Sequence, residues 1–409
     1  MKTTVTKISF DKYDICFSVS RTNPVTAQTP DGQPALEAVW DENGLAVKFY
    51  TSFRTWPLVL TAPHASNGNI LLRVRPYRVE LWAGDVLCDE EWPVGTFGVA
   101  DAVLNTPVEV KPYTEDPTPL PTVLGTFRNA EGWRPEENVF VGDCMPYSYS
   151  ERYHVIYLKD RHHHNSKYGS GAHQWSHIST ADFENWQIHP DVVEIDEQWE
   201  GSICTGSHIE YNGKHYLYYT IRACDGSPAP ICRSVSSDGY HYEKDRAFRM
   251  VLSDAYCKVS ARDPKVVLAE DGILHMFVTT TLHPESTDKK GCLAHLTSSD
   301  GNVWREEPTP IYIAPDGDQP ECPDYFKYHD TYYLVFSHGG SGQYLYSKKP
   351  FTDWQKPENP HIPCESVPKM ALWKGKIVFV GFDRIGGYAG NMTFLTLEPG
   401  ADELFPKQG

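Results

Sequence analysis

One strand-like segment recurs five times along this chain of 409 residues, and the recurrence restricts the fold more than any other feature. Each copy is a short run of aromatic and β-branched residues, which favour β-strands. The first four copies begin about 60 residues apart, and the fifth follows after about 45. The copies span residues 153–158, 216–220, 274–278, 332–336 and 377–380.

A second element keeps step with the first. In four copies, at residues 179–186, 236–242, 298–304 and 347–354, Ser ends a strand, a turn carries an acidic residue, and an aromatic residue begins the next strand. Repeats of this length that contain several strands are typical of a β-propeller with one blade per repeat. We predict an all-β fold with a five-bladed β-propeller over residues 126–409. The turn residues Asp182, Asp238, Asp300 and Asp353 are interpreted as turn-forming only.

The first 125 residues contain short strand patterns without a helical period. The clearest is a hairpin in which residues 78–82 and 86–88 flank the turn Ala83-Gly84-Asp85. An N-terminal β-sandwich over residues 1–125 is the simplest interpretation, with a proline-rich linker at its end. We expect it to be a scaffold, and the alternative is an accessory carbohydrate-binding domain.

Net charge and cysteine usage restrict partners and location. A formal net charge of −17 argues against nucleic acid and anionic membranes as partners. No window approaches the ~20 apolar residues of a membrane span, and the N-terminus lacks the apolar stretch of a signal peptide. The ten cysteines are scattered singly, so we expect free thiols and a cytoplasmic location. The oligomeric state stays open.

Three acidic residues lie in Gly- or Pro-containing segments near the strand-like copies: Asp143, Asp263 and Glu321. Corresponding turns of different blades open at one end of a propeller, so we predict that these carboxyl groups meet at the same phase of the repeat. Such a group suits glycoside hydrolysis, which needs a nucleophile or base and an acid. Crowding and burial are expected to raise the pKa of one of them. Each segment alone is also common turn chemistry.

Several strings resemble those of a known family. Arg262-Asp263-Pro264 is similar to an Arg-Asp-Pro motif and Glu321-Cys322 to a Glu-Cys motif, both of glycoside hydrolase family 32, the invertases, inulinases and levanases. Residues 173–180 are similar to its Trp-Gly-His stretch, and residues 201–207 to the second-blade segment that approaches the sugar. The resemblance covers residues 138–385 and extends more distantly to families 43 and 68.

The resemblance implies roles for individual residues. Asp143 would be the nucleophile, Asp263 the transition-state stabiliser and Glu321 the general acid/base, while Arg262 would hydrogen-bond the sugar and the carboxylates. The implied reaction is exo-acting, retaining hydrolysis of terminal β-fructofuranosyl bonds in an oligosaccharide, without metal or cofactor. The family has Asn-Asp-Pro-Asn around the nucleophile, whereas Gly142 precedes Asp143 here, so the substrate need not be sucrose or an ordinary fructan.

Further substrate-binding candidates follow from the same resemblance and from position. Ser202 and Thr205 lie in the second-blade segment, and Trp175 and His177 lie in the Trp-Gly-His-like stretch. Trp175 is a stacking platform for sugar or, alternatively, blade core. Asp160-Arg161 directly follows a blade strand, so these two residues contact substrate or form a local ion pair.

A run of histidines, His162 to His164, also raises a metal interpretation. Consecutive residues of an extended chain cannot all face one site, so we expect no metal here. We interpret the segment as a polar loop at the rim, with His, Arg161 or Lys167 touching substrate.

Two alternatives stay open from the sequence. One is a furanosidase of another sugar, such as an inverting arabinofuranosidase of the family 43 type. The other is a non-catalytic sugar-binding propeller, for which the altered string around Asp143 is the support.

Overall fold

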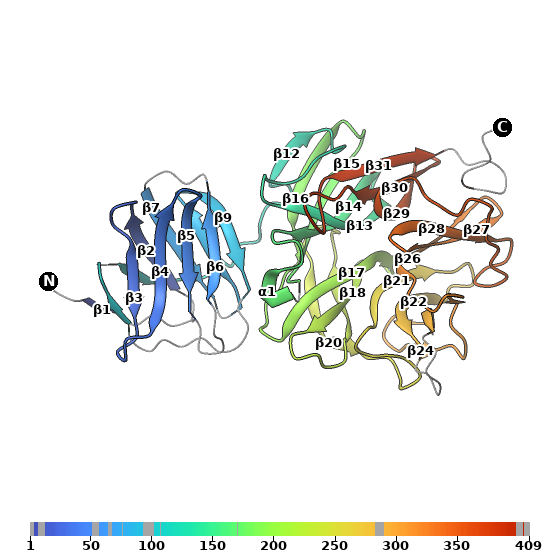
Figure 1. Ribbon diagram of the computed structural model, residues 1–409. Coiled ribbons are helices and arrows are strands. Elements are labelled where there is room, and N and C mark those ends of the chain that lie inside the picture. The colour runs from blue at the N-terminus through green and yellow to red at the C-terminus, as the bar shows by residue number, and fades with distance from the viewer. Residues whose placement is uncertain are drawn as a thin grey trace. The chain divides into compact units, whose positions relative to one another are not determined.

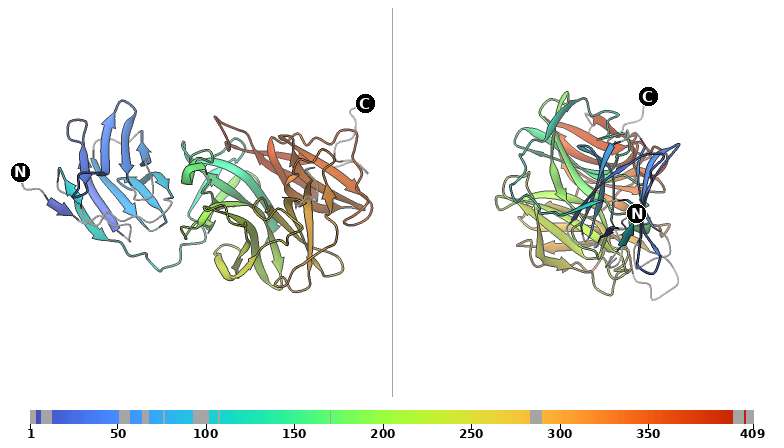
Figure 2. Two further views of the ribbon diagram at one scale, coloured as in Figure 1. Left: turned by 60° about the horizontal axis from the view of Figure 1, so that its bottom comes forward. Right: turned by 90° about the vertical axis from the view of Figure 1, so that its left-hand side faces the viewer.

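The computed structural model describes residues 4–6, 13–50, 57–63, 68–75, 77–92, 102–106, 108–169, 171–282, 290–397 and 404. The chain divides into two compact units, drawn in Figures 1 and 2. The smaller contains Met1–Pro119, Asn165–Ala172 and Ile195–Glu200, and the larger contains Leu120–His164, His173–Glu194 and Gly201–Gly409. The first division lies close to the predicted boundary at residue 125, but two later segments group with the smaller unit.

The described part of the smaller unit contains two antiparallel sheets. The inner faces of the two sheets share one hydrophobic core. Alternate residues of their strands are apolar and buried, for example Leu45, Val47 and Phe49 in β5 (Gly44–Phe49). The predicted hairpin is present as β8 and β9. The first sheet has the order β1 (Thr4–Thr6), β10 (Ala102–Leu104), β3 (Val25–Gln28), β4 (Pro34–Asp41), β5 (Gly44–Phe49) and β6 (Leu58–Ala62). The second has the order β11 (Glu109–Pro112), β2 (Tyr13–Val19), β7 (Gly68–Val74), β8 (Val79–Ala83) and β9 (Val86–Glu91), and α1 (Ser166–Gly169) completes the unit.

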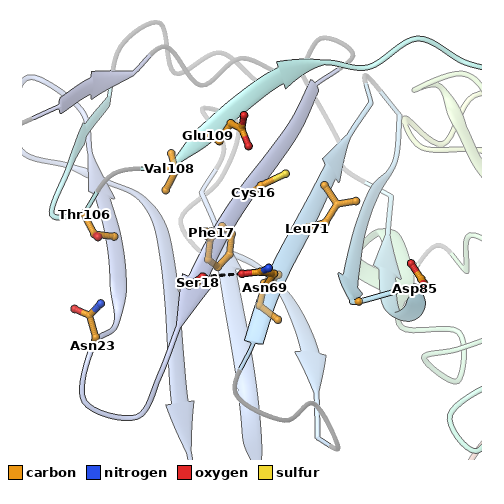
Figure 3. A pocket seen from close by; sticks show the side chains of 12 residues that line it. Cys16, Phe17, Ser18, Asn23, Asn69, Leu71, Asp85, Thr106, Val108 and Glu109 are labelled. Carbon is orange, nitrogen blue, oxygen red and sulfur yellow. Dashed lines mark hydrogen bonds between the residues drawn. The ribbon is translucent and has the colours of Figure 1, made fainter.

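A groove of about 760 Å³ lies on the second sheet of this unit (Figure 3). Small and polar side chains such as Ser18 and Asn69 line it. Among the described residues of the lining, the one aromatic is Phe17, whose side chain is only 5% exposed.

The described residues of the larger unit form five antiparallel sheets in succession along the chain. Each predicted aromatic segment lies in the strand beside an edge strand, namely β14, β18, β22, β27 or β30. The first sheet contains β12 (Gly125–Arg128), β16 (Asn185–Val193), β15 (Gln174–Thr180), β14 (Arg152–Asp160) and β13 (Phe140–Tyr149). The second contains β17 (Glu200–Tyr211), β18 (Lys214–Ala223), β19 (Ile231–Ser236) and β20 (Glu243–Met250). The third contains β21 (Arg262–Leu268), β22 (Leu274–Thr281), β23 (Gly291–Ser298), β24 (Arg305–Glu306) and β25 (Tyr312–Ile313); the fourth contains β26 (Glu321–Tyr328), β27 (Thr331–His338) and β28 (Ser341–Ser347); the fifth contains β29 (Ser366–Trp373), β30 (Lys376–Phe382) and β31 (Met392–Leu397).

The fifth sheet packs against the first. Val141 and Gly390 exchange two backbone hydrogen bonds of 2.8 and 2.9 Å, and one hydrophobic cluster contains residues of both sheets. Further clusters join the second sheet to the third, the third to the fourth and the fourth to the fifth. The red strands of the fifth sheet accordingly lie beside the green strands of the first in Figure 1.

The edge strands β13, β21, β26 and β29 each carry a β-bulge near the start. Their register with the next strand shifts between Val141 and Cys144, Arg262 and Lys265, Glu321 and Asp324, and Ser366 and Lys369. A bulge bends its strand and redirects its side chains. The prediction that the three acids occupy turns at one phase is wrong in detail. Asp143 is the second bulged residue, Asp263 is the first, and Glu321 immediately precedes its bulge.

Three of the four acidic residues of the outer turns form turns, as predicted. Asp182, Asp238 and Asp300 each accept hydrogen bonds through Oδ1 from the backbone N–H groups two and three residues ahead. This is the Asx-type geometry that these short side chains favour. Asp353 instead pairs with Lys349.

In the described part of the chain, no helix is long and apolar enough to cross a membrane. All ten cysteines are free thiols. The cytoplasmic location stays a prediction.

Candidate active site

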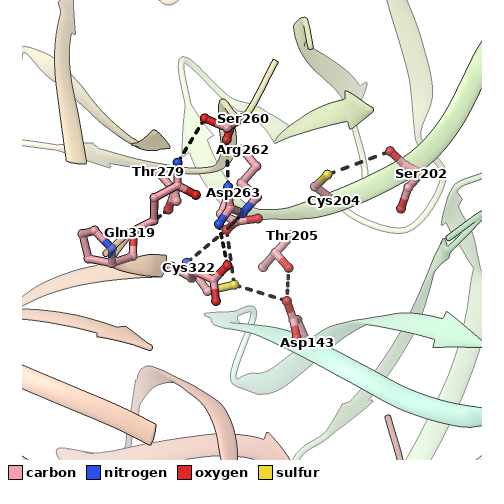
Figure 4. A network of polar contacts seen from close by, with 12 residues as sticks. Asp143, Ser202, Cys204, Thr205, Ser260, Arg262, Asp263, Thr279, Gln319 and Cys322 are labelled. Carbon is pink, nitrogen blue, oxygen red and sulfur yellow. Dashed lines mark hydrogen bonds and ion pairs between the residues drawn. The ribbon is translucent and has the colours of Figure 1, made fainter. Parts of the chain in front are cut away.

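Side chains from four edge strands meet in one polar network of the larger unit (Figure 4). Asp143 on β13 accepts a hydrogen bond from Thr205 on β17, and Asp143 and Asp263 on β21 share the single S–H donor of Cys322 on β26. The strand bulges explain this convergence, because they direct these side chains toward one point.

The carboxylate of Asp143 is 7% exposed and is held by three donors. The Thr205 hydroxyl and the Cys322 thiol donate to Oδ2, the latter at 3.2 Å, and the Tyr388 hydroxyl donates to Oδ1 at 2.9 Å. A carboxylate oxygen accepts about two hydrogen bonds. Oδ2 is therefore saturated by described residues, and Oδ1 is the atom open to a further partner.

Asp263 is 2% exposed and its backbone has a φ of 57°, in the left-handed region. Non-glycine residues seldom adopt this conformation, and those that do cluster at functional sites. Burial raises the pKa of Asp263 to about 6, and the charges of Asp143 and Glu321 add to the rise while Arg262 opposes it. This confirms that one carboxyl group of the site has a raised pKa.

Glu321 has a side chain 51% exposed, and Arg262 connects it to Asp263. Arg262 Nη2 donates to Glu321 Oε1, and Arg262 Nε lies 3.6 Å from Asp263 Oδ2. Its Nη1 donates to the Ser260 carbonyl at 2.8 Å, which fixes the guanidinium. The arginine thus holds both carboxylates, while Glu321 stays accessible to a ligand.

Cys322 lies between the two buried carboxylates. Its thiol is 3.2 Å from Asp143 Oδ2 and 3.4 Å from Asp263 Oδ2, and its backbone N–H donates to Asp263 Oδ2 at 3.1 Å. Burial and both neighbouring charges raise the pKa of the thiol well above its usual value. The group therefore stays protonated and serves as a hydrogen-bond donor rather than as a nucleophile.

Asp160, His173 and Ser202 form a second buried chain. The imidazole Nε2 of His173 lies 3.1 Å from Asp160 Oδ2, and its Nδ1 lies 3.4 Å from the Ser202 hydroxyl. Burial alone would raise the pKa of Asp160, but the hydrogen bond and charge of His173, the backbone N–H of His162 and the charge of His164 together lower it to about 2.

This region also contains a candidate metal-binding group. Asp160, His164 and His173 offer one ligand atom each within 4.8 Å of one another, a nitrogen and oxygen set that suits a divalent transition metal. Both carboxylate oxygens of Asp160 already accept hydrogen bonds, from the backbone N–H groups of His162 and His164 and from His173. These hydrogen bonds fix the Asp160 carboxylate, and the mechanism proposed for this chain assigns no role to a metal ion.

Four predicted contact residues are buried and bond to partners other than the three carboxylates of the site. Trp175 is fully buried with its Nε1 donating to the Cys204 carbonyl at 3.2 Å, so it has no exposed face for a sugar and is core. His177 is fully buried as well, between His154 and Tyr147. Arg161 donates to Asn138 at 2.9 Å, and Lys167 belongs to the smaller unit, where it binds the Gln198 carbonyl at 3.2 Å.

Two residues of the site, the buried Lys369 and the partly buried Tyr388, were not predicted from the sequence. Lys369 on β29 is 1% exposed and donates to the Gly206 carbonyl at 3.0 Å; burial lowers its pKa. Lys369 follows Pro368 as Lys265 follows Pro264. This repeated Pro-Lys pair is visible in the sequence and could have indicated the position of Lys369. Tyr388 lies between β30 and β31 and has no comparable signal.

We expect Asp263→Asn to raise the free energy of unfolding by up to about 3 kcal/mol at pH 8. The folded pKa, about 6, exceeds the unfolded value, 3.8, so the contribution of Asp263 to stability is complete below pH 4 and is lost as the pH rises through 6. The Asp263→Asn variant has no carboxyl group at this position, so it does not lose stability in this way as the pH rises. Urea unfolding of both proteins from pH 5 to 8 measures the difference.

Asp300→Asn is the matched control, because the same change in an exposed turn removes a carboxylate whose pKa is lowered by backbone N–H groups. It should not stabilise the protein at any pH. If Asp263→Asn and the native protein were equally stable at pH 8, the claim that the buried charge of Asp263 destabilises the folded protein would be wrong.

Residues 135–361, more than half of the chain, match the family model described as the glycosyl hydrolases family 32 N-terminal domain. The chain belongs to family 32. The resemblance drawn from the Arg-Asp-Pro and Glu-Cys strings is thereby confirmed.

This family 32 chain is 26% identical to the sucrose-6-phosphate hydrolase of Escherichia coli in an alignment over 238 residues that covers 53% of this chain and 43% of that protein. It is also 26% identical to an insoluble beta-fructofuranosidase isoenzyme of Arabidopsis thaliana over 223 residues, 51% of this chain and 36% of that protein. The chain therefore spans less than half the length of these curated relatives.

Solved structures share the fold. Fructan 1-exohydrolase IIa from Cichorium intybus matches with a TM-score of 0.54 and 16% identity, over 67% of this chain and 58% of that one. A family 43 beta-xylosidase/alpha-arabinofuranosidase from a compost microbial metagenome matches with a TM-score of 0.53 and 16% identity, over 67% of this chain and 96% of that one.

Proposed function

We propose that this family 32 chain is an exo-acting glycoside hydrolase that releases terminal β-fructofuranosyl groups from oligosaccharides with retention. The observation that carries the proposal is the network in which Cys322 and Arg262 join Asp143, Asp263 and Glu321. The names of the relatives, a sucrose-6-phosphate hydrolase and a beta-fructofuranosidase, favour fructose as the transferred sugar.

In the first step Asp143 Oδ1 attacks the anomeric carbon of the fructosyl group, and the bond from this carbon to the leaving oxygen breaks. Oδ1 is assigned the attack because Oδ2 is saturated by Thr205 and Cys322. Glu321 transfers its proton to the leaving oxygen, which its exposure allows. The product of the step is a fructosyl ester of Asp143.

In the second step water attacks the same carbon, Glu321 accepts the proton of the water, and the Asp143 carboxylate leaves. Asp263, partly protonated near neutral pH, binds sugar hydroxyl groups together with Arg262. We assign Ser202, Thr205 and the Asp160–His173 chain to the wall of the sugar site.

The proposal extends to the architecture. We infer that the five sheets of the larger unit are the five blades of a β-propeller, supported by the packing of the fifth sheet on the first. The two sheets of the smaller unit are then a β-sandwich that serves as a scaffold.

The test is incubation with sucrose, sucrose 6-phosphate and 1-kestose in the presence of methanol. Release of fructose, with methyl β-fructofuranoside as the transfer product, is the expected result and identifies retention. A product of α configuration would contradict the covalent intermediate. Saccharide binding without turnover would support a sugar-binding propeller instead.

A second candidate is a furanosidase of another sugar, favoured by the fold shared with the family 43 enzyme and by Gly142 in place of Asn. Aryl α-arabinofuranosides discriminate, because the first candidate predicts no turnover of them.

A further inference from the structure

Gly142, the residue before the proposed nucleophile, leaves space for one particular side chain. A Cβ atom at this position would lie 2.7 Å from the Tyr388 hydroxyl, 3.0 Å from its Cε1 and 3.1 Å from Leu158 Cβ. The backbone of Gly142 has no positive φ, so its conformation does not require glycine. The absent side chain is therefore explained by the close approach of Tyr388.

The Tyr388 hydroxyl makes two hydrogen bonds to one residue. It donates to Asp143 Oδ1 at 2.9 Å and accepts the backbone N–H of Asp143 at 3.2 Å. Burial and the charge of Asp143 raise the pKa of Tyr388 well above its usual value, so the hydroxyl stays protonated. Among the described residues, it is the donor to the oxygen to which we assign the attack.

The loop that carries Tyr388 is held at several points. The Tyr388 carbonyl lies 2.5 Å from His163 Nδ1, and its ring packs on His164 with centroids 3.7 Å apart. Two residues later, Gly390 pairs with Val141 on β13. The hydroxyl is thus fixed with respect to the strand that carries Asp143.

We propose that Tyr388 is a positioning residue for the Asp143 nucleophile, which it holds through the space that Gly142 leaves open. The inference rests on the proposed function. In the second step the carboxylate of Asp143 is the leaving group, and the electron pair of the broken ester bond returns to Oδ1. A donor at Oδ1 stabilises this departing carboxylate. Without it, hydrolysis of the fructosyl-enzyme becomes the slower step.

The principal test is Tyr388→Phe. We expect kcat on sucrose or 1-kestose to fall about 10- to 100-fold, the factor that a hydrogen bond to a charged group carries. KM should fall with kcat, because the covalent intermediate accumulates, and rapid mixing should show a burst of the leaving alcohol. An unchanged kcat, or a lower kcat at constant KM without a burst, would overturn the assigned role.

Tyr153→Phe is the matched control. Tyr153 is a fully buried tyrosine, whereas Tyr388 is partly buried, and the Tyr153 hydroxyl donates to the Val378 carbonyl at 3.0 Å rather than to a carboxylate. Tyr153→Phe removes the same hydroxyl oxygen as Tyr388→Phe. We therefore expect a similar drop in melting temperature, with unchanged kcat and KM. Gly142→Ala, whose new methyl group displaces the Tyr388 hydroxyl, should reproduce the kinetics of Tyr388→Phe.

A double-mutant cycle on unfolding free energy separates this inference from the proposed function. Asp143→Ala and Tyr388→Phe should be non-additive because they remove two ends of one contact, whereas Asp143→Ala and Tyr153→Phe should be additive. A native protein that releases no fructose overturns the proposed function. Additivity of the first pair overturns the contact, whatever the activity.

Discussion

Asp143→Asn is expected to lower kcat for fructose release by about 10⁴-fold or more while the protein stays folded. The amide has nearly the shape of the carboxylate, but it cannot form the fructosyl ester. Loss of the charge also lowers the pKa of Asp263, because the Asp143 carboxylate is one of the groups that raise it. Steady-state kinetics from pH 5 to 8, with melting temperatures, measure both effects. Asp300→Asn, the same change in an outer turn, should keep full activity.

Azide distinguishes a nucleophile from an acid/base at these positions. With an activated aryl β-fructofuranoside, Asp143→Ala should give α-fructosyl azide. Azide then attacks the anomeric carbon of the substrate directly, displaces the aryl group and inverts the configuration. Glu321→Ala should give β-fructosyl azide, because azide attacks the fructosyl ester of Asp143. The exchanged pattern would contradict the assigned roles, and absence of rescue in both variants would contradict the two-step mechanism.

The repeat architecture was predictable because it depends on local chemistry. Aromatic and β-branched runs form strands, and Ser-x-Asp turns close by hydrogen bonds within a few residues, as at Asp238 and Asp300. Two local elements in register were enough to predict five successive sheets.

The chemical composition of the site was predictable, but its geometry was not. Asp143, Asp263, Glu321, Arg262 and Thr205 meet as predicted from their strings. Their offset of one residue within the bulges could not be read from the sequence, because a bulge depends on pairing with the next strand.

Burial was the least predictable property. Trp175 and His177 have side chains that suit a sugar site, yet both are buried between neighbouring elements. Tyr388 lies 245 residues from Asp143, so the contact depends on the fifth sheet packing against the first.

Four buried histidines and the partly buried His208, between the first and second sheets, predict a strong dependence of stability on pH. His154 Nδ1 lies 2.9 Å from His177 Nε2, and His208 Nε2 lies 3.0 Å from His215 Nδ1, while the ring of His189 packs on that of His177 with centroids 4.5 Å apart. Burial lowers the pKa of His154 to about 3 and that of His189 to about 4. It also lowers the pKa values of His177, His208 and His215.

Lowered folded pKa values make these histidines a source of acid instability. Between pH 6.5 and 4 the unfolded chain binds protons that the folded protein excludes, so stability is complete at neutral pH and is lost as the pH falls. At pH 5, His154 and His189 each lower the free energy of unfolding by about 2 kcal/mol relative to neutral pH. Asp263 acts in the opposite direction, but it recovers only about 1 kcal/mol between pH 7 and 5. Because a folded domain is stable by about 5–15 kcal/mol, a loss of this size is a substantial part of its stability.

Urea unfolding at pH 7.5 and pH 5.0 tests this expectation. The native protein should lose at least about 3 kcal/mol between the two conditions, and His154→Gln/His189→Gln should lose markedly less, whatever its stability at pH 7.5. His241→Gln is the control of opposite sign, because Asp238 raises the pKa of this exposed histidine, which therefore contributes stability at acid pH and loses it as the pH rises. A native protein equally stable at both pH values would show that the cluster accepts protons while folded, through rearrangement of the His154–His177 and His208–His215 pairs.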